Sequence, residues 1–394
     1  MSALPATSST AHAPAYLDYA ATTPLDPRVA AAMSECLTQG DLFGNPASAH
    51  YYGRLAHAGV ERSRAQVADL IGAEPAQIVW TSGATESNNL AILGTARAAA
   101  RRGRHVLTAR TEHKSVLDSC RRLEREGFRL TYLTPDRDGL IDPAQVRAAI
   151  GADTVLVSLM HANNETGVLQ DIEALARVCQ ECDVPLHVDA AQSAGKVPID
   201  LRRSPIALLS LTAHKLYGPK GVGALYVSRE RRGALEPLIY GGGQERGLRS
   251  GTLALHQIAG FGLACELSRL EQNTDAQRVG ALRERLWAGL GSIEGALLNG
   301  HPTRRVPGIL NVSFGGVEGE SLLAGLAELA LSTGSACNSD SDEPSYVLRA
   351  LGRDSQLAQS SLRLSLGRFS SEQEVDRAVA AVGRELRRLR AVAP

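Results

Sequence analysis

The stretch LTAHKLYGPKGVGALYV, residues 211–227, carries the strongest indication of both fold and chemistry in this chain. It closes an apolar run, IALLSL, with polar residues that include His214 and Lys215. The glycine-rich segment GPKGVG follows, and a second apolar run comes directly after it. Glycines let the backbone turn back sharply, so the pattern predicts a buried strand, a tight return and another strand. A lone lysine at a strand end is ordinarily a surface charge, whereas a lysine beside a hydroxyl and a histidine indicates a reactive site.

Short apolar runs alternate with helical stretches such as ESNNLAILGTARAAARR and DIEALARVCQEC. The runs are IVWTSG, HVLTAR, TVLVSLM, VPLHVDA, IALLSLT and GALYVS. This alternation predicts a mostly parallel sheet with helices on both faces. Polar residues follow the carboxyl ends of the runs, at Thr81, Ser82, His161, Asp189, His214 and Lys215. Ligands bind at that edge of open α/β sheets, so these side chains are expected to face one crevice.

The length of 394 residues, 44% of them hydrophobic, favours two domains. Residues 1–15 are small and uncharged, and a disordered tail is expected there. A large sheet domain is expected over 16–262. A smaller C-terminal α/β domain is expected over 263–394, where helical segments alternate with ILNVSF and SSLRLSLGRF.

The composition argues against several functions. The formal net charge is +0, and the basic cluster RELRRLRAV is typical of the solvated face of a terminal helix, so nucleic-acid binding is not expected. No apolar run approaches the roughly 18–20 residues that span a bilayer. The N-terminus lacks the features of a secretory signal, and six cysteines scattered over the chain do not form a disulfide framework. A soluble cytoplasmic protein is therefore expected.

Lys215 and Asp189 suggest a cofactor. A partly buried lysine loses proton affinity and becomes an amine that can form a Schiff base. Pyridoxal 5'-phosphate (PLP) requires such a lysine, a carboxylate for its pyridine nitrogen, a phosphate site and a partner for its ring. Asp189, at the end of an apolar strand, would supply the carboxylate. A helix-capping role for Asp189 remains open on the sequence alone.

The segment TSGATESNNLAI, residues 81–92, is typical of a strand, a turn and the start of a helix. The amides of Ala84 and Thr85 and the Thr85 hydroxyl would lie at a helix N-terminus, which favours a bound phosphate. An ordinary helix cap with Glu86 in the first turn is the alternative.

Cys337 lies in LSTGSACNSDSDEPSYVLRALG, a stretch without apolar periodicity, so an exposed loop is expected there. Most free cysteines are buried like small apolar residues, whereas exposure on a loop fits a reactive thiol. Cys179 and Cys182 form a CxxC pattern, but on a helical stretch and without a second pair of ligands. No metal site is predicted.

Together these stretches resemble the cysteine desulfurases related to the bacterial iron–sulfur-cluster enzyme. That group belongs to the class V aminotransferases, within the PLP-dependent fold of aspartate aminotransferase (fold type I). The resemblance runs from LDYAATTPLDPRV to LRLSLGRF. It includes FGNPAS, TSGATES, TEHKSVLD, HANNETGV, HVDAAQSAGK, HKLYGPKG, GGGQERGLRSGT and SACNSDSDEPSYVLRALG. The expected fold is a large domain with a mostly parallel sheet and a smaller C-terminal α/β domain.

The resemblance implies roles for individual residues. Lys215 would hold PLP as a Schiff base, Asp189 would pair with the pyridine nitrogen and Gln192 with the phenolic oxygen. His113 would stack on the ring and assist proton transfer, although alone it is typical of a structural histidine. The phosphate would be held by Ala84, Thr85, Thr212, His214 and, from the partner subunit of a homodimer, Thr252.

The substrate carboxylate would be bound by Arg363 and by Asn164, which also belongs to the cofactor site, with Asn45 nearby. Cys337 would accept the sulfur of L-cysteine as a persulfide, release L-alanine and pass the sulfur to an acceptor or scaffold protein. The transferred sulfur would then serve iron–sulfur cluster assembly or the thiolation of a cofactor or a nucleic acid. Many relatives read Ser-Gly where this chain has Thr212-Ala213; threonine keeps the hydroxyl.

Other functions share part of this pattern. A selenocysteine lyase or another class V aminotransferase would keep Lys215 and Asp189 without depending on Cys337. A scaffold for sulfur transfer without catalytic activity would need neither Lys215 nor Cys337, and both are present. A cysteine hydrolase would leave the cofactor residues unexplained.

Overall fold

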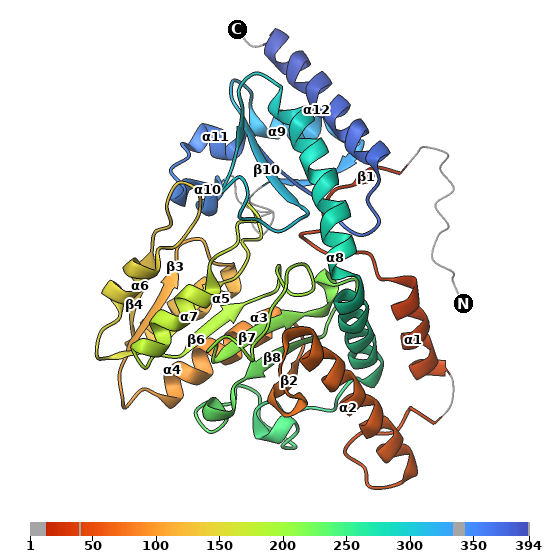
Figure 1. Ribbon diagram of the computed structural model, residues 1–394, viewed down its shortest axis with the longest axis vertical. Coiled ribbons are helices and arrows are strands. Elements are labelled where there is room, and N and C mark those ends of the chain that lie inside the picture. The colour runs from red at the N-terminus through yellow and green to blue at the C-terminus, as the bar shows by residue number, and fades with distance from the viewer. Residues whose placement is uncertain (1–12, 39–40, 334–342, 393–394) are drawn as a thin grey trace.

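The computed structural model describes residues 13–38, 41–333 and 343–392. Its centre is a seven-stranded sheet with strand order β2-β8-β7-β6-β5-β3-β4 (Figure 1). The strands are β2 (Ile78–Thr81), β3 (His105–Ala109), β4 (Arg129–Leu133), β5 (Thr154–Met160), β6 (Leu186–Asp189), β7 (Leu208–Thr212) and β8 (Gly223–Val227). β7, β6, β5, β3 and β4 are parallel, and β8 runs antiparallel to both of its neighbours.

Helices cover both faces of this sheet because successive strand residues point to opposite sides. Leu107 belongs to a core with α2 (Tyr51–Ile71), α7 (Ile172–Glu181) and the first turns of α8 (Leu255–Gly291). The preceding Val106 belongs to a second core on the other face. Helices α3 (Ala84–Asn89) and α5 (Lys114–Arg125), with the intervening π-helical turn Leu90–Gly94 and α4 (Thr95–Ala98), form that side. The prediction of a mostly parallel sheet between helices is confirmed.

A smaller sheet forms the upper part of the molecule in Figure 1. It has the order β12-β13-β10-β9, with antiparallel neighbours. The strands are β9 (Ala296–Leu298), β10 (Ile309–Phe314), β12 (Ser332–Thr333) and β13 (Ser361–Ser365), and β1 (Ala15–Tyr16) pairs separately with β11 (Leu329–Ala330). This unit has its own core, which includes α12 (Glu372–Val392) and the second half of α8. The predicted smaller α/β unit is therefore present.

The remaining helices are α1 (Pro27–Thr38), α6 (Pro143–Ala149), α9 (Gly319–Ala324), α10 (Tyr346–Ala350) and α11 (Ser355–Gln359). Helix α8 runs from the large sheet to the small one and crosses residue 262 (Figure 1). None of the helices in the ranges that the structure describes combines the length and the apolar character that a membrane span requires.

The N-terminal segment braces the turn that carries Lys215. The Thr23 amide donates to the His214 carbonyl at 2.9 Å, and the Asp26 amide donates to the Tyr217 carbonyl at 3.0 Å. Tyr217 has φ +63°, which is uncommon for a residue with a side chain. Its amide donates to Thr23 Oγ1 at 2.8 Å, and these bonds hold the turn in its unusual conformation.

Candidate active site

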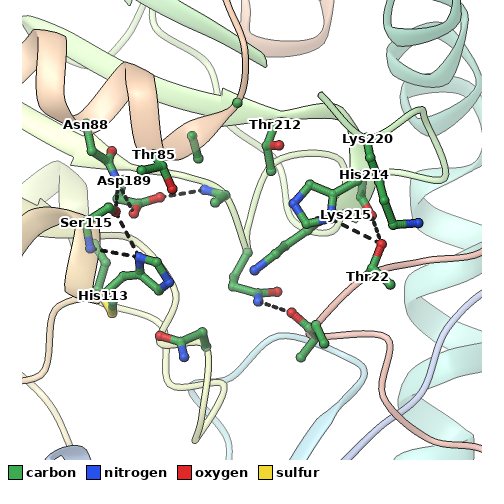
Figure 2. A pocket seen from close by; sticks show the side chains of 18 of the residues that line it. Thr22, Thr85, Asn88, His113, Ser115, Asp189, Thr212, His214, Lys215 and Lys220 are labelled. Atoms are coloured by element: carbon green, nitrogen blue, oxygen red, sulfur yellow. Dashed lines mark hydrogen bonds between the residues drawn. The ribbon is translucent and has the colours of Figure 1, made fainter. Parts of the chain in front are cut away.

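A cavity of about 500 Å³ lies at the carboxyl end of the parallel strands, where the sequence predicts a ligand crevice. Asp189 is the last residue of β6 and Thr212 the last of β7, while Lys215 ends the short helix that follows β7. Thr85 lies in the first turn of α3, and His113 caps α5. Figure 2 shows these side chains converging from separate elements.

The structure brings most of the predicted site residues to this cavity. They are Ala84, Thr85, His113, Asn164, Asp189, Gln192, Thr212, His214, Lys215 and Arg363. Asn45 and Thr252 line a second cavity, of about 370 Å³. Cys337 lies outside the described residues.

Asp189 is held in place from two sides. One of its oxygens accepts a hydrogen bond from Asn88 Nδ2 at 2.7 Å, and the other accepts from the Ala191 amide at 2.9 Å. The side chain is only 5% exposed. A buried carboxylate with lone pairs to spare is suited to a cationic partner inside the cavity.

Ser115 connects Asn88 to His113. Asn88 Nδ2 also donates to Ser115 Oγ at 2.9 Å, and Ser115 Oγ lies 2.8 Å from His113 Nδ1 (Figure 2). The Ser115 amide donates to the same nitrogen at 3.1 Å, so Nδ1 is an acceptor and the neutral ring carries its proton on Nε2. Burial lowers the pKa of His113, and the nearby Asp189 carboxylate partly opposes this shift. The imidazole is therefore neutral near pH 7.

The start of α3 faces the cavity with backbone donors. Its first amides, at Ala84 and Thr85, have no carbonyl to bond within the helix. Gly223 of β8 passes so close that a Cβ there would lie 2.6 Å from the Gly83 Cα, which only glycine permits. The result is an open backbone cradle between α3 and Thr212, suited to an anion.

His214 lies on the opposite wall. Its Nδ1 is 3.2 Å from Thr22 Oγ1, in the N-terminal segment. Burial first, and then the charges of Lys215, Lys220 and Lys196, lower the pKa of His214 to about 4. The ring is thus neutral, and this wall concentrates lysine charge that favours an anionic ligand.

Arg363, on β13, brings the smaller unit into the site. It is 3% exposed, and its Nη2 donates to Asp18 Oδ1 at 2.8 Å while Nη1 donates to the Asn164 carbonyl at 3.1 Å. Arg363 Nε and Asn164 Oδ1 are buried polar atoms without a partner among the described residues. Because such atoms are costly, they indicate a polar ligand at this end of the cavity.

The second cavity rests on a buried ion pair. Arg64 donates to both oxygens of Glu245, at 2.7 and 2.8 Å, and Glu245 also accepts from the Trp80 amide at 2.8 Å. Arg64 and Glu245 line this cavity together with Thr252 and Asn45.

Several residues of the cavity were not predicted. Asn88, Ser115 and Thr22 line it, as do Lys220 and Glu86, whose carboxylate pairs with Arg249 at 2.8 Å. Four of them lie inside stretches that carry the family resemblance, and Asn88 directly follows one, TSGATES, so those stretches were the signal in the sequence.

Comparison with known proteins agrees with this geometry. The family model described as Aminotransferase class-V matches residues 15–378. The protein named cysteine desulfurase IscS of Shewanella woodyi is 54% identical over 382 residues, which are 97% of this chain and 95% of that protein. A solved structure titled NifS-like protein has a TM-score of 0.89 at 36% identity, covering 95% of this chain and all of its own. Another, titled SspA in complex with cysteine, has a TM-score of 0.80 at 39% identity, covering 90% and 99%.

The fold, the cavity and these matches define a PLP-dependent enzyme, and the chain belongs to the class-V aminotransferase family. Within that family it belongs with the cysteine desulfurases, the group that the sequence motifs predict.

The residues of the cavity fit this cofactor. A lysine and a buried carboxylate, Lys215 and Asp189, line the same space, and the backbone cradle beside Thr212 would accept a phosphate. Arg363 Nε, a donor that has no partner among the described residues, marks the end where a carboxylate would bind, and Asn164 Oδ1 beside it would accept from a donor on the ligand.

Proposed function

We propose that this enzyme converts L-cysteine to L-alanine, keeps the sulfur as a persulfide on Cys337 and passes it to acceptor proteins. The observation that carries the proposal is the placement of Arg363 and Asn164 in the same cavity as Lys215 and Asp189. An arginine can bind an amino-acid carboxylate through two hydrogen bonds. The lysine and the aspartate meet the needs of PLP at the other end.

When bound, PLP draws electrons from the α-carbon of an amino acid, which eases removal of the α-proton. Lys215 would hold the cofactor in the resting enzyme and then move this proton as a free amine. Asp189, fixed by Asn88, would stabilise positive charge on the pyridine nitrogen. Gln192 would donate to the phenolic oxygen.

His113 would lie against the cofactor ring. Its Nδ1 accepts from the Ser115 amide, so the neutral ring carries its proton on Nε2, and this is the nitrogen that would exchange a proton with the substrate. A neutral imidazole with a lowered pKa can pass a proton without holding it.

The phosphate would lie between the start of α3 and the turn after β7. Ala84 and Thr85 would supply backbone and hydroxyl donors, Thr212 a further hydroxyl, and His214 a ring nitrogen. Lys220, which also lines the cavity, would add positive charge.

Sulfur transfer needs a second nucleophile, for which Cys337 is proposed. Its thiolate would attack the substrate sulfur and form a sulfur–sulfur bond. The bond between Cβ and sulfur breaks and leaves its electron pair on carbon, which takes up a proton and becomes the methyl group of alanine. Atoms and electrons balance without an outside oxidant, because the sulfur ends as the persulfide of Cys337.

We further propose that the enzyme acts as a homodimer. Thr252 lines the second cavity and is not among the residues that line the cavity of Lys215, as expected if it serves the partner's site. Exposed apolar side chains occur in the neighbouring segments: Phe43, Tyr51, Tyr52, Ile239 and Tyr240. Such exposed groups favour contact with another protein surface.

The sulfur acceptor would be a protein of the iron–sulfur cluster, cofactor or nucleic-acid thiolation pathways. Scattered cysteines without disulfides among the described residues suit a reducing compartment, and we place the activity in the cytoplasm.

The test is release of alanine from L-cysteine without added keto acid. Wild type should release alanine, whereas Cys337→Ala should keep the absorption of bound PLP and release none. Cys182→Ala, at the end of α7, is the matched control and should behave as wild type. Equal release by wild type and Cys337→Ala would reject Cys337 as the acceptor. Release of alanine from L-selenocysteine but not from L-cysteine would indicate a selenocysteine lyase. Release of alanine from neither substrate would indicate a scaffold without catalytic activity.

A further inference from the structure

Lys196 lies behind the active site and contacts Gln192. Its Nζ donates to Gln192 Oε1 at 2.9 Å, from four residues further along the chain. Gln192 Nε2 donates to the Ala20 carbonyl at 2.7 Å. Both ends of the Gln192 amide are therefore assigned, and only the second hydrogen on Nε2 remains for a ligand in the cavity.

The surroundings of Lys196 do not neutralise it. It borders a small cavity of about 40 Å³ that is also lined by Tyr19, Tyr217 and Asp275. Asp275 accepts a hydrogen bond from Arg368 Nε at 2.8 Å. In the ranges that the structure describes, no carboxylate lies within ion-pair distance of Lys196.

Two cations act on Lys196 from the side of the active site. Lys215 and Arg363 both act on it electrostatically, and His214 on the same wall is affected by Lys196. Burial first, and these cations next, lower the pKa of Lys196 to about 7. Burying the Lys196 amine here costs free energy, and its hydrogen bond to Gln192 offsets part of that cost.

We propose that Lys196 is a positioning residue, which fixes the Gln192 amide through Oε1 so that Nε2 is aimed at the phenolic oxygen of PLP. The inference rests on the role proposed above for Gln192. Gln192 is 3% exposed, so an Oε1 without a donor would pay the desolvation of a buried polar atom. Without Lys196, Oε1 would lose its donor and the Ala20 carbonyl would be the remaining described contact that orients the amide, so the amide would rotate and Nε2 would move away from the phenolic oxygen.

The experiment compares the pH midpoint of the absorption of bound PLP in four variants: Lys196→Met, Lys196→Gln, Gln192→Ala and the double variant Lys196→Met/Gln192→Ala. A donor to the phenolic oxygen stabilises the deprotonated form of the bound cofactor, so its loss moves the midpoint to higher pH. Lys196→Met should raise the midpoint by about 0.5–1 unit, the equivalent of one hydrogen bond. Lys196→Gln keeps a donor without a charge and should remain near wild type.

The double variant separates positioning from a general effect of charge. If Lys196 acts through Gln192, the double variant should have the midpoint of Gln192→Ala. Additive shifts, or an equal shift in Lys196→Gln and Lys196→Met, would overturn the proposal. Where Lys196→Met is purified without PLP, the same comparison is made by titrating PLP into each variant and measuring its dissociation constant.

The same data distinguish this inference from the proposed function. No shift in Gln192→Ala would reject the role of Gln192 and the positioning by Lys196 together. A shift in Gln192→Ala but none in Lys196→Met would overturn only the positioning. A positive result would stand even if the enzyme released no alanine from cysteine, because the readout is the bound cofactor.

Discussion

Asn88 Nδ2 donates a hydrogen bond of 2.7 Å to the Asp189 carboxylate, deep in the large domain. The same nitrogen donates to Ser115 Oγ, which contacts His113. A single amide therefore connects the two residues proposed to contact the pyridine nitrogen and the ring face. It holds both at the end of the parallel sheet.

The Asn88→Ala variant tests this connection. Removing the amide leaves the buried Asp189 with one fewer donor and frees Ser115 to rotate, at a cost of about 1–3 kcal/mol. The dissociation constant of PLP, measured by absorption on titration of the apoenzyme, should rise by roughly 10-fold or more. Gln145→Ala, an exposed change on α6, is the control and should bind PLP as wild type. Unchanged affinity in Asn88→Ala would contradict the connection.

Arg363 and Asp18 should act together on the substrate. Lysine cannot make the bidentate hydrogen bonds that arginine makes with a carboxylate. In Arg363→Lys the KM for L-cysteine should therefore rise about 10- to 100-fold, while the absorption of bound PLP is unchanged. Asp18→Asn removes the charge that holds Arg363 Nη2 and should raise KM in the same direction by less. A KM of Arg363→Lys equal to that of wild type would remove Arg363 from the substrate site.

The pH dependence of stability should reflect His187, a histidine buried inside the sheet. It lies 2.9 Å from both Ser158 Oγ and Ser210 Oγ, and burial lowers its pKa to about 4. The unfolded chain takes up a proton at the ordinary pKa of 6.5, which the folded protein resists. This group therefore leaves stability intact above pH 6.5 and reduces it as the pH falls toward 4. The full effect is about 3 kcal/mol.

His187→Gln should flatten this loss, which is measured as the Tm of the holoenzyme between pH 7 and pH 4.5. Glu165 gives a contrast of opposite sign. Burial raises its pKa to about 7, above its ordinary 4.5, so its contribution is present at low pH and lost as the pH rises toward 7. Glu165→Gln should therefore raise Tm relative to wild type at pH 8 more than at pH 5. Parallel Tm curves for wild type and His187→Gln would contradict the assignment.

The homodimer can be tested by complementation. Lys215→Ala and Thr252→Ala should each have little activity alone. In a mixed dimer, the intact Lys215 of one chain meets the intact Thr252 of the other, so one of the two sites is complete. About half of the dimers in a statistical mixture are of this kind, so the restored activity averages up to about half of one site per dimer. Mixing that restores nothing would place Thr252 at the site of its own chain. The matched control is a mixture of Lys215→Ala with itself.

Much of the sheet was predictable because apolar runs alternate with helical stretches, and polar residues end the runs. Asp189 and Lys215 were expected at one edge for that reason, and the structure places both in one cavity. The long helix α8 was less apparent. Gly260 and Gly262 change the pattern near the expected boundary, yet they are packing positions, where a Cβ would meet Met33 Sδ and Ser63 Cα at 2.7 Å.

The supporting contacts of the site were not predictable in the same way. Asn88 contacts Asp189, and Thr22 contacts His214, across separations of 101 and 192 residues. Local propensity and periodicity do not specify such pairs, since they arise only when the sheet edge and the N-terminal segment meet. Lys196 likewise looks like an ordinary solvated lysine until its contact with Gln192 is seen.

The most direct test of the central claim is the mass of the Cys337 peptide after the enzyme meets one equivalent of L-cysteine without reductant. The account predicts that this peptide gains one sulfur atom, that alanine appears in equal amount, and that a reductant removes the added sulfur. A Lys215→Ala enzyme treated in the same way should gain none. Alanine release without added sulfur on Cys337, or sulfur on Cys337 in the Lys215→Ala enzyme, would contradict the account.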